Sequence, residues 1–117
     1  MSKIVERRPQ SLPPEPLPNA ISFDLGGSLA SHEDVYNQLG AYLKSFGDFH
    51  IKSLQFVALS FRWVVLLDSK TARDRIAGGR VNINGRTVLL RRYDDVMLLE
   101  YKKNLRGNGL VDMFKQT

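Results

Sequence analysis

The basic side chains are the residues of this sequence whose type and spacing say most about what the protein could bind. Seven of them lie between Lys70 and Arg92, against the single acid Asp74, and the whole chain has a formal net charge of +5. A concentrated positive field attracts phosphate groups and speeds association with polyanions. The charge distribution therefore predicts a polyanionic partner, although solvated surface charge alone would give a similar pattern.

The sequence contains no recognisable pattern of catalytic or cofactor-binding residues. His32 and His50 lack a matched nucleophile or carboxylate, and neither glycine pair is followed by the lysine of a phosphate-binding loop. The sequence contains no cysteine and no long apolar run. We therefore expect no enzyme activity, no cofactor, no metal and no membrane partner, and an intracellular protein of the nucleus or cytoplasm.

Apolar periodicity divides the chain into a leader and one domain. Residues 1–19 hold all five prolines, which predicts a disordered proline-rich leader. Alternating and helical patterns then predict strands and helices in turn. These are a strand at Ile21–Leu25, a helix at 32–45, strands at Ile51–Val57 and Phe61–Leu67, a short helix between Ser69 and Gly78, a strand through Val88–Leu90 entered by the Asn84-Gly85 turn, a helix at 94–106 and a flexible tail at 107–117.

This element order predicts an α+β fold. Two interleaved strand-helix-strand units close as a ferredoxin-like βαββαβ sandwich, with a four-stranded antiparallel sheet and two helices on one face. The domain covers residues 20–93, and the third helix is an addition to it. The second face of the sheet is left as the natural binding surface. We expect it to show Ser22, Asp24, Arg62, Val64, Leu66, Leu89, Arg91 and Tyr93.

Four segments resemble the RNA recognition motif family. They are Phe46-Gly47-Asp48-Phe49, Val65-Leu66-Leu67-Asp68, the spacing from Ala72 to Ile76, and residues 84–90. The resemblance implies binding of single-stranded RNA by stacking of bases on aromatic side chains of the two central strands. Here Asp24, Arg62 and Val64 occupy those positions, so the sequence is similar to an atypical member without the stacking aromatics. By the same alternation, Trp63 faces the helices with Val65 and Leu67.

The leading hypothesis is an RNA-binding module that contacts single-stranded RNA mainly through basic residues. The residues assigned to this role are Arg62, Arg86, Arg91, Arg92 and Lys52, with Tyr93 as the one stacking candidate.

The alternative is a protein interaction or dimerisation module on the same scaffold. It would use Val64, Leu89, Leu98, Leu99 and Tyr101, and it draws on the apolar tail residues Leu110, Val111, Met113 and Phe114. An exposed apolar sheet face is usually covered, and Met97, Tyr101 and Leu105 would let the third helix lie across it.

Overall fold

The computed structural model describes residues 13–107, with side chains as far as Asn104. The predicted leader up to residue 12, and the tail residues Leu110, Val111, Met113 and Phe114, lie outside the described residues. In chain order the elements are β1 (Ala20–Asp24), α1 (His32–Lys44), β2 (Ile51–Val57), β3 (Arg62–Leu67), α2 (Lys70–Ile76), β4 (Arg80–Ile83), β5 (Arg86–Leu89), β6 (Arg91–Arg92) and α3 (Tyr93–Gly107).

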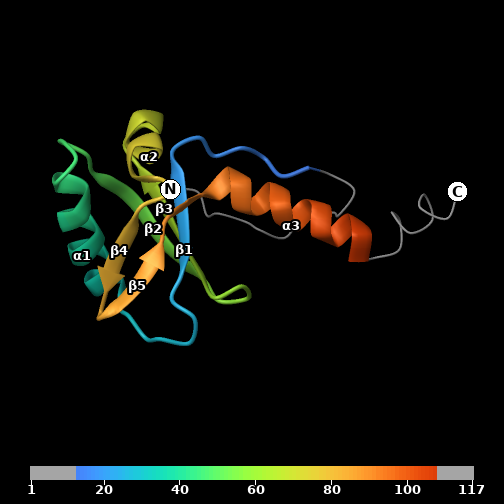
Figure 1. Cartoon of the computed structure of the whole chain (residues 1–117), viewed down its shortest axis with the longest axis horizontal. Coiled ribbons are helices and arrows are strands. Elements are labelled where there is room, and N and C mark those ends of the chain that lie inside the picture. The colour runs from blue at the N-terminus through green and yellow to red at the C-terminus, as the bar shows by residue number, and fades with distance from the viewer. Residues whose placement is uncertain (1–12, 108–117) are drawn as a thin grey trace, which may run out of the picture.

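The architecture is α+β, with a four-stranded antiparallel sheet in the order β2-β3-β1-β6 and three helices (Figure 1). This confirms the predicted α+β class and the expectation of a four-stranded antiparallel sheet. Local signals explain the helices. Ser31 and Asp34 form a complete capping box at the start of α1, and the Ser69 side chain caps α2.

The two faces of the sheet carry separate hydrophobic clusters. Trp63, Val65 and Leu67 of β3 pack with Val35, Leu39 and Leu43 of α1 and with Ala72 and Ile76 of α2. The intervening Val64 packs with Tyr93, Val96 and Met97 of α3 instead. Alternate residues of a strand point to opposite faces, so α1 and α2 cover one face and α3 lies on the other. The predicted inward orientation of Trp63 is confirmed.

The fourth strand differs from the prediction. Val88 lies in β5, which pairs only with β4 in a separate two-stranded sheet, and the strand beside β1 is the two-residue β6. The reason is that Val81, Ile83 and Val88 face inward together and join the core formed with α1 and α2. The chain therefore forms a hairpin over the core and reaches the sheet edge only at Arg91–Arg92.

The end of the proline-rich segment contacts the domain. The backbone N–H of Leu17 donates a hydrogen bond to Asp94 Oδ1 at 2.6 Å, and the Asn19 side chain donates to the Leu67 carbonyl at 2.6 Å. Leu17 also packs against the cluster beneath α3. The contacts of the domain thus begin a few residues before Ala20.

Candidate nucleic-acid interface

The β4–β5 hairpin presents one buried and one exposed face. Its turn is Asn84-Gly85, with both residues at positive φ, and the register pairs Arg80 with Leu89 and Ile83 with Arg86. This turn chemistry is the strongest short hairpin signal. Val81, Ile83 and Val88 point inward, and Arg80 and Leu89 are exposed on the opposite face. Arg86 pairs with Ile83 and so lies on the inward-facing side, at the tip of the hairpin, where it is still exposed.

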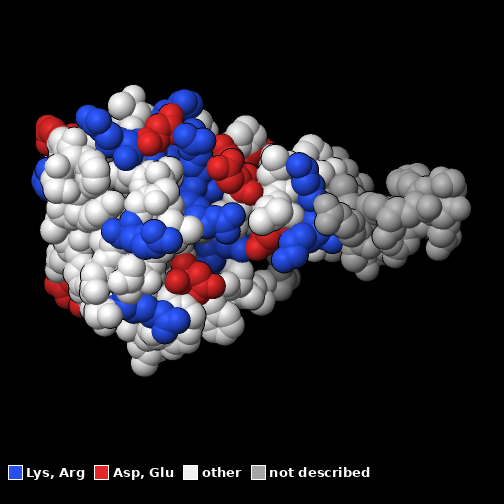
Figure 2. Space-filling model, viewed as in Figure 1, with Lys and Arg blue, Asp and Glu red and all other residues white. Residues whose placement is uncertain are grey.

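We call Arg80, Arg86, Arg91 and Arg92 the arginine strip. These four residues belong to β4, β5 and β6, and all are exposed. Figure 2 shows basic side chains gathered over the face that carries β4, β5 and the start of α3, with acidic side chains among them. Within residues 13–107, Arg80, Arg86 and Arg91 have no carboxylate at ion-pair distance. The positive charges of these three guanidinium groups are therefore not neutralised by an ion pair among the described residues.

The carboxylate of Asp74 in α2 forms ion pairs with three basic side chains. Its carboxylate lies 2.8 Å from Lys70 Nζ, 2.9 Å from Arg73 Nη2 and 3.3 Å from Arg92 Nε. Hydrogen bonds from Lys70 and then Arg73 lower the pKa of Asp74 from 3.8 to about 2. Arg73 also reaches Asp94 Oδ2 at 3.4 Å. This network partly neutralises the positive charge near α2, including that of Arg92, whereas the other three arginines of the strip have no such partner among the described residues.

Arg86 is held against the loop between β1 and α1. Its Nη1 donates to Ser28 Oγ at 3.2 Å. Its guanidinium lies so close to Gly26 that a Cβ there would be 3.1 Å from Nη2, and Gly26 has a φ of +65°. A glycine at this position both allows the turn and leaves room for the guanidinium.

The open sheet face expected from the sequence is covered by α3. Tyr93 is only 4% exposed and Val64 is fully buried, so neither the predicted stacking residue nor the predicted contact valine is accessible with α3 in place. Arg62 is 7% exposed and pairs with Glu100 of α3. These three predicted site residues therefore hold α3 on the sheet in this structure.

The other predicted residues are distributed over different surfaces. Lys52 is exposed on β2, and the strand order puts β2 and β6 at opposite edges of the sheet. Leu98 and Leu99 of α3 are 44% and 48% exposed, whereas Tyr101 is partly buried. Leu89 lies beside the arginine strip. Arg91 and Arg92 of β6 pair with Ser22 and Ile21, so their side chains leave opposite sides of the main sheet, and Lys52 lies at its other edge.

Arg80 is a member of the strip that the sequence analysis omitted. Counting outward from the Asn84-Gly85 turn pairs position 80 with position 89, on the outer face of the hairpin. The Asn84-Gly85 turn is enough to predict this register. The sequence analysis assigned the strand after the turn to the main sheet, and so it did not place Arg80 opposite residue 89.

A polar hollow lies between β6 and α3. It has a volume of about 340 Å³, and its walls include Ser22 and Asp24 of β1, Arg62 of β3, Arg91 of β6 and Glu100 of α3. The charged groups that line it are two carboxylates, Asp24 and Glu100, and two guanidinium groups, Arg62 and Arg91. Arg62 is paired with Glu100, so Arg91 supplies the guanidinium of this hollow that has no carboxylate partner among the described residues.

The tip of the hairpin is fixed to α1 by Asn84. Gln38 Nε2 donates to Asn84 Oδ1 at 2.6 Å, and the Asn84 backbone N–H donates to Gln38 Oε1 at 2.7 Å. Asn84 Nδ2 donates to Asp34 Oδ2 at 3.2 Å. This bond, followed by one from the Ser31 backbone, lowers the pKa of Asp34 below 3.8. The tip of the hairpin that carries Arg80 and Arg86 is thereby held on α1.

Among residues 13–107, no group of three or more histidine, cysteine or acidic side chains is placed to hold a metal ion. The same part of the chain contains no helix with the length and apolar character needed to cross a membrane. Comparison with known proteins gave no matching family, no similar curated protein and no similar solved structure.

Proposed function

We propose that the chain is an RNA-binding module related to the RNA recognition motif, which binds the phosphates of single-stranded RNA through the arginine strip. The order of elements and the sheet order β2-β3-β1-β6 support this relationship, together with the sequence segments that resemble the family. The observation that carries the binding proposal is the set of exposed guanidinium groups at Arg80, Arg86 and Arg91 without carboxylate partners among the described residues.

The proposed contacts are mainly electrostatic. The usual stacking surface is beneath α3, and the one tyrosine at its edge is buried. Arginine makes planar, paired hydrogen bonds with phosphate and is more weakly hydrated than lysine. Binding through three such groups should be weakly selective for sequence and strongly dependent on salt.

Fluorescence anisotropy with a short, mixed-sequence single-stranded RNA tests this proposal. Each neutralised phosphate of a single strand contributes about 0.7 to the slope of log affinity against log salt. Replacing Arg80, Arg86 and Arg91 with alanine together should therefore reduce the slope by about 2. Lys52→Ala, at the opposite edge of the sheet, is the matched control and should leave the slope unchanged.

Two results would count against the proposal. One is a triple variant that folds, as judged by circular dichroism, and binds with the parent affinity and salt slope. The other is a parent protein whose binding does not change between about 50 and about 200 mM salt.

A second candidate function is protein interaction or dimerisation through α3. Leu98 and Leu99 are adjacent and almost half exposed, although this helix already uses Val96 and Met97 to cover the sheet. Sedimentation velocity over a range of concentrations tests self-association. A dimer that dissociates in the Leu98→Glu, Leu99→Glu variant would favour this candidate, and a protein that stays monomeric would contradict dimerisation.

A further inference from the structure

The Asn84-Gly85 turn joins two residues that can react with each other. Where glycine follows asparagine, the backbone nitrogen of the glycine can attack the side-chain carbonyl carbon of the asparagine, because glycine has no side chain to obstruct the approach. The sequence has two such pairs, and Asn84-Gly85 is the one that lies within residues 13–107. Nothing lies within 4 Å of the position that a Cβ would occupy at Gly85, so the described residues leave room for the reaction.

The docked hairpin tip engages both reacting groups in other bonds. The Gly85 N–H donates to Asn82 Oδ1 at 2.8 Å, so this nitrogen is held with its proton. The Asn84 side chain accepts from Gln38 Nε2 at 2.6 Å and donates to Asp34 Oδ2 at 3.2 Å. Figure 1 shows the β4–β5 turn beside the first part of α1, to which these bonds attach it. Ring closure must break them, so the reaction requires the tip to open locally from α1.

Deamidation would remove the groups that hold the tip. Asn84 Nδ2 donates to the Asp34 carboxylate and, at 3.4 Å, to the Leu29 carbonyl. The carboxylate that replaces this amide has no hydrogen to donate, and it would face the Asp34 carboxylate as a like charge. In isoaspartate the backbone also gains a methylene carbon, which disrupts the two-residue turn. Both products therefore disfavour docking of the tip on α1.

We propose that Asn84 is a site of spontaneous deamidation whose rate is set by opening of the hairpin tip, and that the product leaves the tip undocked. The Gly85 nitrogen forms a bond to Asn84 Cγ, the Cγ–Nδ2 bond breaks, and Nδ2 leaves as ammonia with the proton from Gly85. Water then opens the five-membered ring. Attack at Cγ gives aspartate, and attack at the main-chain carbonyl carbon gives isoaspartate. The proposal does not depend on RNA binding.

Timed incubation of the full-length chain in mildly alkaline buffer, followed by tryptic digestion and mass spectrometry, measures the reaction. The tryptic peptide 81–86 contains the site, and its fragmentation distinguishes Asn84 from Asn82. The second Asn-Gly pair, at 108–109, lies outside the described residues and falls in a different tryptic peptide. We expect Asn84 to react at least about 10-fold more slowly in the folded chain than in a synthetic peptide of residues 80–90, with aspartate and isoaspartate both formed.

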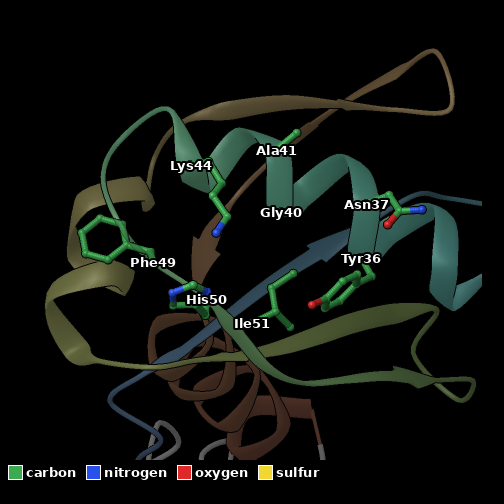
Figure 3. Close-up of a pocket in the computed structure, with 8 residues that line it drawn as sticks. All are labelled: Tyr36, Asn37, Gly40, Ala41, Lys44, Phe49, His50 and Ile51. Carbon is green, nitrogen blue, oxygen red and sulfur yellow. The ribbon is translucent and has the colours of Figure 1, made fainter.

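Gln38→Ala tests whether the tip controls the rate. The substitution removes the donor to Asn84 Oδ1 and the acceptor of the Asn84 backbone N–H, and it changes neither reacting group. Loss of these two hydrogen bonds should raise the open fraction of the tip, and with it the rate at Asn84, by about 5-fold. Asn37→Ala is the matched control and should leave the rate unchanged. Figure 3 shows Asn37 among the residues of α1 that line a separate hollow, toward the start of β2.

Asn84→Asp represents the aspartate product. Amide hydrogen exchange should become faster in β4 and β5 of this variant and stay unchanged in β2. Adding Asp34→Asn returns an amide donor to the contact and removes the like charge, so the double variant should recover slow exchange.

Four results would overturn the proposal. Asn84 stays intact in the parent, in Gln38→Ala and in the peptide, or it reacts as fast in the parent as in the peptide. Alternatively, Gln38→Ala reacts no faster than the parent, or Asn84→Asp exchanges its hairpin amides as slowly as the parent does.

Discussion

The docking of the hairpin tip on α1 gives the most quantitative prediction. We consider Asn84→Gly, which removes the side-chain bonds to Gln38 Nε2, Asp34 Oδ2 and the Leu29 carbonyl. Asn84 has a φ of 51°. Glycine adopts positive φ without strain, so the variant removes the hydrogen bonds and leaves the turn intact.

The expected loss of stability near neutral pH is modest. A neutral hydrogen bond contributes about 0.5–1.5 kcal/mol net, and exposed bonds fall in the lower part of that range. The short bond to Gln38 and the longer one to the Leu29 carbonyl should together contribute about 1 kcal/mol. The bond to Asp34 adds a contribution that depends on pH.

The sign of that pH dependence follows from the lowered pKa of Asp34. The stabilisation from ionised Asp34 is complete above its unfolded value of 3.8 and is lost as the pH falls through the lower folded value. The hydrogen bond from Asn84 is the main cause of the lowered pKa. The stability difference between the parent and Asn84→Gly should therefore narrow as the pH falls below 3.8.

Urea unfolding followed by tryptophan fluorescence measures both effects. Trp63 is the one tryptophan in the sequence and is 3% exposed in the core, so its emission reports global unfolding. Gln38→Ala removes the same contact from the helix side, and the two substitutions should be strongly non-additive. Additive losses, together with a stability difference that does not change with pH, would refute the docking of Asn84 on α1.

Three further predictions concern Gly79, α3 and the Asp74 network. Gly79→Ala would place a Cβ in steric overlap with the Tyr42 hydroxyl and should destabilise the fold by about 1–3 kcal/mol, with most of this loss recovered in a Tyr42→Phe background. If urea unfolding shows the same loss from Gly79→Ala with Tyr42 and with Phe at position 42, the steric reason is contradicted. Glu100→Gln removes the charge paired with Arg62, so amide hydrogen exchange should rise in α3 but not in β2, and unchanged exchange in α3 would count against this pairing. The stability contributed by ionised Asp74 is complete above pH 3.8 and is lost as the pH falls toward about 2. The free energy of unfolding of Asp74→Asn should therefore depend less on pH in this range than that of the parent. An unchanged pH dependence in the variant would show that the network does not form.

Much of the fold was predictable because its signals are local. The alternation of β3 placed Trp63 in the core, and the Ser31–Asp34 capping box located the start of α1. The Asn84-Gly85 turn located the hairpin. The strand that joins the sheet was misplaced because β6 is only two residues long and carries no apolar alternation of its own.

The candidate site was predictable only in part. The sequence identified Arg86, Arg91 and Arg92 from their charge, since charge is a property of each residue alone. It could not separate Lys52 from them, because the strand order decides which edge each residue occupies.

The sequence by itself determined the α+β class, the antiparallel sheet and the concentration of positive charge, since these follow from local periodicity and composition. Only the tertiary structure decided that α3 lies over the second face of the sheet, burying Tyr93 and pairing Arg62 with Glu100. The physical reason is that an apolar strand face can be covered by any apolar surface in reach, and residues 38 positions apart pair only when the fold brings them together.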